Sequence, residues 1–144
     1  MITVSIEGTE QAIEEARKRA VQNVNQKVVS RGTRAVNAIR NAELEVMRGQ
    51  RSGRIYKKPG GGTYQASAPG EAPAVRTGNL RLSWSAELEI EGSLQGDIKV
   101  GAQLISNTEY AQYLEFGKRS PRPFVEKIQE KAYPDVLKIY KEPY

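Results

Sequence analysis

Apolar side chains in the N-terminal third of the chain recur at helical spacing. From Ile13 they continue at steps of three, four or a multiple, through Ala16, Ala20, Val24, Val28, Ala35, Ile39, Ala42 and Val46. The pattern predicts a helix over 10–47 that packs closely against its partner, because nearly all members of the stripe are small. A helix of this length exceeds the usual globular range, so we expect it to reach beyond its own domain. Gly32 on the stripe is compatible with a kink, a close approach or a break between two helices.

Strict alternation of apolar and polar residues predicts strands in two places. Ile2, Val4 and Ile6 alternate with polar residues, which predicts a strand over 2–7. Over 77–105 the pattern predicts a capped turn followed by a hairpin, with one apolar face from Leu82 to Ile90 and again from Ile98 to Leu104. The Gly92–Gly96 region turns the chain between them. We expect the three strands to form one sheet that the long helix covers.

Proline and glycine dominate the remaining connections. Residues 48–76 show no periodicity, and their glycines make the first half flexible while the prolines of the second half favour an extended chain. A loop of this length predicts either disorder in the free protein or ordering against a partner. Over 108–140 we expect short helices, with Gly117 left-handed at the end of one, Pro123 at the first position of the next, and Pro134 kinking or restarting the last.

Together these elements predict an α+β fold in a single domain spanning 1–144. A small antiparallel sheet (the N-terminal strand plus the hairpin) packs against a long N-terminal helix, with short C-terminal helices and a long Pro/Gly-rich loop. The 144 residues are 38% hydrophobic and 27% charged, enough for a modest core. The N-terminus has no signal-peptide pattern and no apolar run has bilayer-spanning length, so we expect a cytosolic product with no membrane partner.

The composition argues against an enzyme. The chain contains neither histidine nor cysteine, which removes the commonest general base, the usual triad base and the commonest metal ligands. Glu87, Glu89 and Glu91 alternate along one strand face and are interpreted as a solvated charged face rather than a metal site. Glu115 lies among aromatic residues and is expected to make a hydrogen bond or an ion pair, with Arg76, Arg81 or Arg122 as candidate partners. We therefore predict no catalytic activity, no cofactor and no metal.

Four short motifs follow one another in the second half of the chain. They are Ser67-Ala-Pro-Gly-Glu-Ala-Pro-Ala74, Arg76-Thr-Gly-Asn-Leu-Arg81, Tyr110-Ala-Gln-Tyr-Leu-Glu-Phe-Gly117 and Arg122-Pro-Phe124. In this order they resemble the signatures of the tail-completion, or head–tail joining, proteins of long-tailed bacteriophages. The resemblance covers roughly Tyr64 to Phe124. Two departures are Lys118, where the family pattern usually has a small polar residue, and the run Val125-Glu126-Lys127, where it is more apolar.

The resemblance implies a virion structural protein of the phage neck. Such a protein forms a ring, sixfold or twelvefold, that completes the tail and joins it to the head connector, with DNA passing through. Its partners would be copies of itself, the head connector or adaptor, and tail-tube or tail-terminator proteins, and it would move from the host cytoplasm into the virion. The expected contact residues are Ser67, Pro69, Gly70, Glu71, Pro73, Arg76, Thr77, Gly78, Leu80, Tyr110, Tyr113, Glu115, Phe116, Gly117, Arg122, Pro123 and Phe124.

Positive charge is concentrated in one part of the loop. The net charge is +5 and the isoelectric point is near 9.5. Five cations, Arg48, Arg51, Arg54, Lys57 and Lys58, fall within a stretch that contains no acid, with Tyr56 and Tyr64 nearby to stack on bases. They are candidates for a sequence-independent DNA contact, and equally for a solvated loop or for ion pairs with a neighbouring subunit. The alternative function is accordingly a small basic nucleic-acid-binding module.

Overall fold

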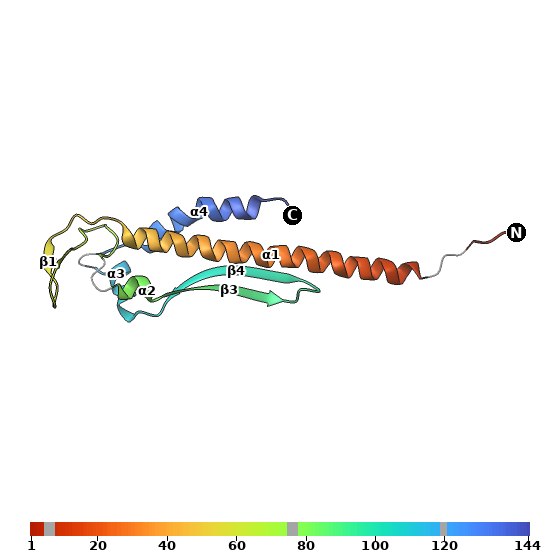
Figure 1. The fold of residues 1–144 in the computed structure, drawn as a ribbon, viewed down its shortest axis with the longest axis horizontal. Coiled ribbons are helices and arrows are strands. Elements are labelled where there is room, and N and C mark those ends of the chain that lie inside the picture. The colour runs from red at the N-terminus through yellow and green to blue at the C-terminus, as the bar shows by residue number, and fades with distance from the viewer. Residues whose placement is uncertain (5–7, 75–77, 119–120) are drawn as a thin grey trace.

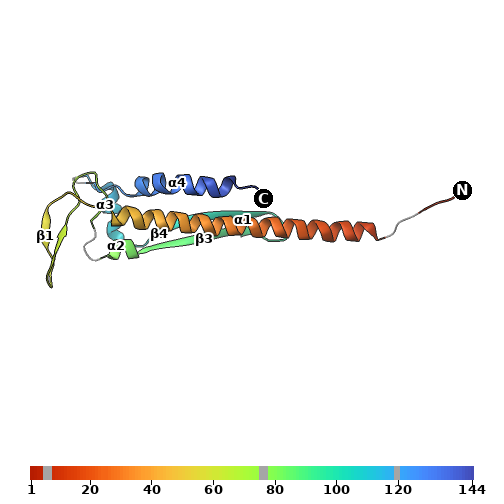
Figure 2. The ribbon, with the colours of Figure 1, turned by 45° about the horizontal axis from the view of Figure 1, so that its top comes forward.

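The computed structural model describes residues 1–4, 8–74, 78–118 and 121–144, and within them the fold is α+β. The elements in chain order are α1 (Thr9–Arg48), β1 (Ile55–Lys57), β2 (Thr63–Gln65), α2 (Asn79–Leu82), β3 (Trp84–Gly92), β4 (Ile98–Ser106), α3 (Glu109–Phe116) and α4 (Val125–Lys141). Helix α1 forms the axis of an elongated molecule, with α4 and the β3–β4 hairpin packed along it (Figure 1). The β1–β2 hairpin projects at one end, and the N-terminus lies at the other (Figure 2).

The long helix is confirmed, and it runs without a break through Gly32. Gly32 is buried where the helix crosses the sheet, and a Cβ atom built there would lie 2.4 Å from Val100 Cγ1 and 2.7 Å from Leu88 Cδ1. The close-approach interpretation of this glycine is therefore the one that the structure supports. Its lack of a side chain lets α1 lie directly on the apolar face of the hairpin.

The β3–β4 hairpin is antiparallel, with its register running from Trp84 opposite Ser106 to Gly92 opposite Ile98. The alternation is as expected, and Lys99 lies across from Glu91, with 3.9 Å between Nζ and the carboxylate. Leu82 is not part of the strand. It ends α2 and is 68% exposed, because the helical turn before the sheet carries its side chain outward.

The core lies where α1, the start of the hairpin, α3 and α4 meet. Phe124 is 1% exposed, and its ring meets that of Trp84 edge to face at 5.7 Å between centroids. Around it pack Ala42, Met47, Ala72, Ala111, Ile128 and Ala132. At the far end of α4, Arg34 forms a two-bonded ion pair with Glu142, with both N–O distances 2.6 Å, which fastens the C-terminal segment to α1.

The expected N-terminal strand is not found in the described residues. Residues 1–4 belong to no strand and are fully exposed, while residues 5–7 of the predicted strand lie outside the described part of the chain. The reason is the length of α1. Asn25 donates hydrogen bonds to the carbonyl oxygens of Leu94 (2.9 Å) and Gly96 (2.7 Å) at the hairpin turn, so everything before it projects beyond the sheet.

Three further expectations about local structure are corrected. Gly117 is extended (φ −60°, ψ 129°) rather than left-handed, because the amide of Arg122 bonds the carbonyl of Leu114 at 2.7 Å and thereby closes the last turn of α3. Pro123 precedes α4 instead of occupying its first position, since Phe124 is the N-cap residue. Helix α4 also continues through Pro134, which faces solvent.

Candidate functional site

An open groove of about 710 Å³ lies at the C-terminal end of α1, where the arm, α2 and α3 meet. Here the arm means residues 66–74. The lining residues are Met47, Lys58, Pro59, Tyr64, Ala66, Ser67, Pro73, Ala74, Gly78, Asn79, Leu80, Arg81, Tyr110, Leu114 and Arg122. Each of the four sequence motifs contributes at least one residue to this groove. Of the other motif residues, Arg76 and Thr77 lie outside the described part of the chain.

The arm has an ordered internal structure centred on Glu71. The carboxylate accepts hydrogen bonds from the backbone amides of Ala68 (2.8 Å) and Ser52 (3.1 Å), and also from the Ser52 hydroxyl. These bonds, the hydroxyl first, lower the pKa of Glu71 to about 2. The carboxylate of a motif residue therefore ties the arm to the chain that follows α1.

Three cationic side chains fix the arm to the body. Arg51 donates to the carbonyl of Pro73 at 3.1 and 3.3 Å and to that of Val46 at 2.9 Å. Arg122 Nε donates to the Ser67 hydroxyl at 2.7 Å, and Lys127 Nζ donates to the carbonyl of Gly70 at 2.7 Å. The arm is thus already packed against the start of α4 in the single chain, with Ala72 and Pro73 buried.

The β1–β2 hairpin was not predicted from the sequence. Its two strands pair Ile55 with Gln65, Tyr56 with Tyr64 and Lys57 with Thr63, and the two tyrosine rings stack at 5.8 Å. Gly60, Gly61 and Gly62 all take positive φ in its turn, which other residues adopt only with strain. The signal was present, because β-forming residues stand on both sides of a Pro-Gly-Gly-Gly run, but each strand is only three residues long.

The basic residues divide between this hairpin and its base. Arg54 and Lys57 are exposed, Lys58 is half-buried beside the groove, and the Arg54 guanidinium lies 5.7 Å from the centre of the Tyr56 ring. Arg48, at the end of α1, is exposed as well. Arg51 differs, because its donors are occupied by backbone carbonyls of the chain itself. Its role is to hold the arm, which the sequence did not indicate.

The aromatic residues of the motifs separate into exposed and buried members. On α3, Tyr113 is 77% exposed and Phe116 is 78% exposed, while Tyr110 at the groove is 43% exposed. Phe124 lies in the core, so its side chain is not accessible in the free chain. The exposed pair Tyr113 and Phe116 is therefore the part of these motifs that presents large apolar surface to solvent.

Glu115 is engaged in hydrogen bonds, and Arg76, one of its expected partners, lies outside the described residues. The Oε2 atom of Glu115 accepts hydrogen bonds from the backbone amides of Phe124 (2.7 Å), the N-cap residue of α4, and Val125 (3.3 Å), the first residue of that helix. The hydrogen-bond half of the expectation is confirmed, with backbone groups as the partners. A carboxylate at a helix N-terminus satisfies otherwise unpaired donors and also meets the positive end of the helix dipole.

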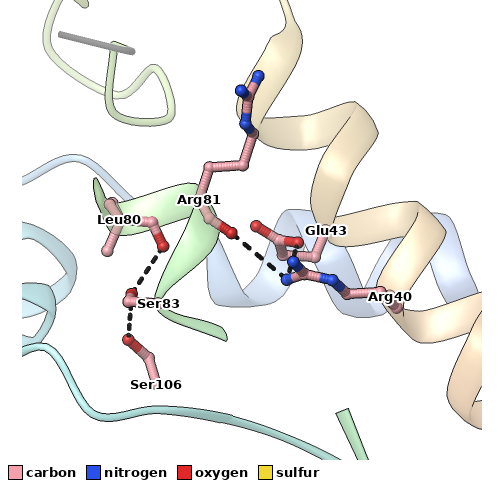
Figure 3. Close-up of polar contacts among 6 residues, drawn as sticks. All are labelled: Arg40, Glu43, Leu80, Arg81, Ser83 and Ser106. Carbon is pink, nitrogen blue, oxygen red and sulfur yellow. Dashed lines mark hydrogen bonds and ion pairs between the residues drawn. The ribbon is translucent and has the colours of Figure 1, made fainter. Parts of the chain in front are cut away.

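Helix α2, which places Leu80 and Arg81 on the groove, is held by polar contacts from both sides (Figure 3). The Ser83 hydroxyl donates to the Leu80 carbonyl at 2.8 Å and lies 3.2 Å from the Ser106 hydroxyl. On the α1 side, Arg40 bridges the Glu43 carboxylate (2.6 Å) and the Arg81 carbonyl (3.4 Å). Burial raises the pKa of Glu43, against the opposing effect of Arg40.

Neither a metal centre nor a membrane span is found in the described residues. Within 1–4, 8–74, 78–118 and 121–144, no group of three or more acidic side chains is placed to hold a metal ion. Among the helices in the same part of the chain, none is both long and apolar enough to cross a membrane.

The glutamates at 87, 89 and 91 are exposed on the outer face of β3, as the solvated-face interpretation requires.

Comparison of the chain with protein-family models, with curated proteins and with solved structures gave no match.

Proposed function

We propose that the chain is a structural protein of the neck of a long-tailed phage. In this proposal, copies of the chain form a ring that completes the tail and joins it to the head connector, and DNA passes through the ring. The motif resemblance suggests this role. Support from the structure is the convergence of four motifs, spread over residues 67–124, on one groove and the helix beside it.

The convergence is the observation that carries the proposal. Ser67 of the first motif and Arg122 of the last are hydrogen-bonded to each other, and Tyr110 and Leu80 line the same groove. These residues build a shaped surface, and no group of three or more acidic side chains among the described residues is placed to hold a metal ion. A surface of that kind is suited to recognition of another protein.

The distribution of exposed groups favours contacts between unlike ends. Helix α3, which carries the exposed aromatic pair Tyr113 and Phe116, lies at the C-terminal end of α1, while the N-terminal part of α1 projects at the opposite end (Figure 1). An interface that joins two different patches of identical subunits closes into a ring when the rotation between neighbours divides a full turn.

The test uses the exposed aromatic pair. In a phage that encodes the chain, Tyr113→Asp together with Phe116→Asp is expected to leave a folded protein but to abolish the joining of heads to tails, because two charges enter an apolar contact. Gln112→Asp on the same helix is the matched control, since Gln112 is an exposed polar residue. Electron microscopy of lysates counts separate heads and tails. Normal particle yield from the double variant would contradict the proposal.

The alternative function as a basic nucleic-acid-binding module is favoured by one observation. The β1–β2 hairpin projects from the body and carries two exposed cations beside a pair of stacked tyrosines. Tight, steeply salt-dependent DNA binding by the monomer, with no ring under any condition, would favour this second function over the first.

A further inference from the structure

A second groove, of about 570 Å³, runs between α4 and β4 and is distinct from the one described above. Its apolar walls come from four elements: Ile39 of α1, Trp84 at the start of β3, Ala102 and Leu104 of β4, and Ile128, Ala132 and Val136 of α4. In both views β4 is the strand of the hairpin nearer to α4 (Figures 1 and 2). Apart from Trp84 at the start of β3, the hairpin residues that line the groove belong to β4, so the groove extends along β4 toward the side that does not pair with β3.

That side of β4 is an open sheet edge. Among the described residues, β4 pairs with β3 alone, and the sheet has two strands. A free edge presents unpaired backbone N–H and C=O groups, and isolated two-stranded sheets are only marginally stable in water. An extended segment placed along β4 would satisfy these groups. Its alternate side chains would then point into the apolar groove.

Residues 1–4 carry apolar side chains that are exposed to solvent. Met1, Ile2 and Val4 are 118%, 94% and 84% exposed, and the sequence around them alternates as a half-buried strand does. In a strand, the side chains of Ile2 and Val4 point to the same side. They therefore suit the free edge of β4, where one side faces the apolar groove.

This segment cannot reach β4 of its own chain. Asn25 is level with the hairpin turn, and the helix from Thr9 to Asn25 is about 24 Å long at 1.5 Å per residue. An extended chain folding back from Gly8 covers at most about 25 Å by Met1, at 3.3–3.6 Å per residue. It would arrive only at the turn, whereas Ala102 and Leu104 lie further along the strand. The segment is therefore available only to another molecule.

We propose that the N-terminal segment of one copy adds as a strand to the free edge of β4 in a second copy, with Ile2 and Val4 seated in the groove beside α4. The projecting part of α1 acts as the spacer that carries the segment to its neighbour; residues 8–20 are all exposed. The inference rests on the proposed function in that it names the contact between copies of the ring. Donor and acceptor are different patches, so the contact repeats head to tail.

The first test compares two changes in the donor. Ile2→Asp with Val4→Asp is expected to reduce the assembled species to the 16.0 kDa monomer, because the groove would have to bury two carboxylates. Thr3→Asp is the matched control, since its side chain points away from the groove in a strand. Both variants should fold, because residues 1–4 are fully exposed, and circular dichroism verifies this. Sedimentation velocity measures the mass of the species in solution. An assembled double variant, or a wild-type chain that is monomeric at all concentrations, would overturn the inference.

The second test locates the acceptor. A synthetic peptide of the first eight residues is added to the monomeric double variant, and amide hydrogen exchange is followed. Slower exchange confined to Ile98–Ser106 is expected, whereas the same peptide with both substitutions should have no effect. Protection at another site, or none at saturating peptide, would overturn the proposal.

The two proposals fail in different ways. If the Ile2→Asp, Val4→Asp variant completes phage particles as well as wild type, strand addition is overturned while the neck role stands. If assembly in solution depends on the segment but particles form without the chain, the neck role is overturned and strand addition stands.

Discussion

The Glu115 carboxylate lies 2.7 Å from the backbone nitrogen of Phe124, so a side chain of α3 caps the N-terminus of α4. Glu115→Ala is expected to lower the free energy of unfolding by about 1 kcal/mol, the usual value of an N-cap side chain. Glu115→Gln should lose less, because the amide oxygen still accepts a hydrogen bond. Thermal unfolding followed by circular dichroism measures both changes.

Glu130→Ala is the control for this pair, because Glu130 is exposed on α4 and a single charge is removed from the same region. Its effect should stay within about 0.5 kcal/mol. Equal losses from Glu115→Ala and Glu130→Ala would mean that the cap contributes nothing.

Gly32 is expected to resist the substitution that normally stabilises a helix. Alanine gains about 1 kcal/mol in helix propensity. Its Cβ, however, would lie 2.4 Å from Val100 Cγ1, and relieving such overpacking costs about 1–3 kcal/mol. We expect a net loss of stability in urea unfolding. Ser30→Ala, at an exposed position of the same helix, should be neutral or slightly stabilising.

A double-mutant cycle tests the cause. Gly32→Ala combined with Val100→Ala should cost less than the sum of the two single changes, because the second substitution removes the methyl group that clashes. Additive losses would show that crowding between α1 and β4 is not the source.

The side-chain amide of Asn25 donates hydrogen bonds that stabilise the turn of the β3–β4 hairpin. Its Nδ2 contacts the carbonyl oxygens of Leu94 and Gly96, so Asn25→Ala should cost about 1 kcal/mol. Asn25→Asp should cost more near pH 7, because a carboxylate would face carbonyl oxygens with no hydrogen to donate. The difference in stability between Asn25→Asp and wild type should become smaller as the pH falls toward 4, because the new carboxyl group is then protonated. Urea midpoints at several pH values measure it, and a gap independent of pH would contradict this account.

Glu71 makes the arm sensitive to acid. Hydrogen bonds from Ser52 and Ala68 lower its pKa from 4.5 to about 2. Because the folded value is depressed, the contribution of this carboxylate to stability is complete above about pH 5 and is lost as the pH falls toward 2. In NMR spectra, the amides of Ser52 and Ala68 should titrate with a midpoint near 2. Those resonances should not titrate in Glu71→Gln, and a wild-type midpoint near 4.5 would contradict the bonding scheme.

The projecting β1–β2 hairpin predicts a localised DNA contact. Changing Arg54, Lys57 and Lys58 to Gln should weaken binding to duplex DNA and reduce the slope of log affinity against log salt by about 3. The control changes Arg17, Lys18 and Arg19 of α1 to Gln, an equal loss of charge on exposed residues. Gel shifts at several salt concentrations give both slopes. Equal losses from the two sets would indicate that only net charge matters.

Periodic patterns predicted the parts of the fold that bury a continuous apolar face. The β3–β4 hairpin and the part of helix α1 from Asn25 onward belong to this class, because each repeats its signal over many residues. The earlier stripe residues Ile13 and Val24 are 67% and 44% exposed, because that part of α1 projects beyond the sheet. The β1–β2 hairpin does not, since three-residue strands give too short a pattern. The position of the N-terminal segment depended on how far α1 extends past Asn25, a tertiary relationship that alternation in residues 2–7 cannot encode.

Local rules failed where distant residues supplied the hydrogen bonds. Gly117 was expected to be left-handed, yet Arg122 already satisfies the carbonyl at the end of α3. Arg51 was interpreted as part of a basic surface, yet its guanidinium binds backbone carbonyls of the arm. In both cases the donor and the acceptor come from different parts of the chain, so local sequence does not pair them. The candidate contact residues could therefore be named from motifs, while their division into exposed and buried members depends on the folded structure.

The solvent-surrounded first turns of α1 have an energetic consequence. Residues 8–20 are all exposed, so little burial stabilises this stretch of helix, and helices of that kind fray readily in water. A subunit that docks through this end loses conformational entropy when the frayed turns become ordered. This loss weakens the first contact between two free subunits, so assembly starts from nuclei in which several contacts form at once.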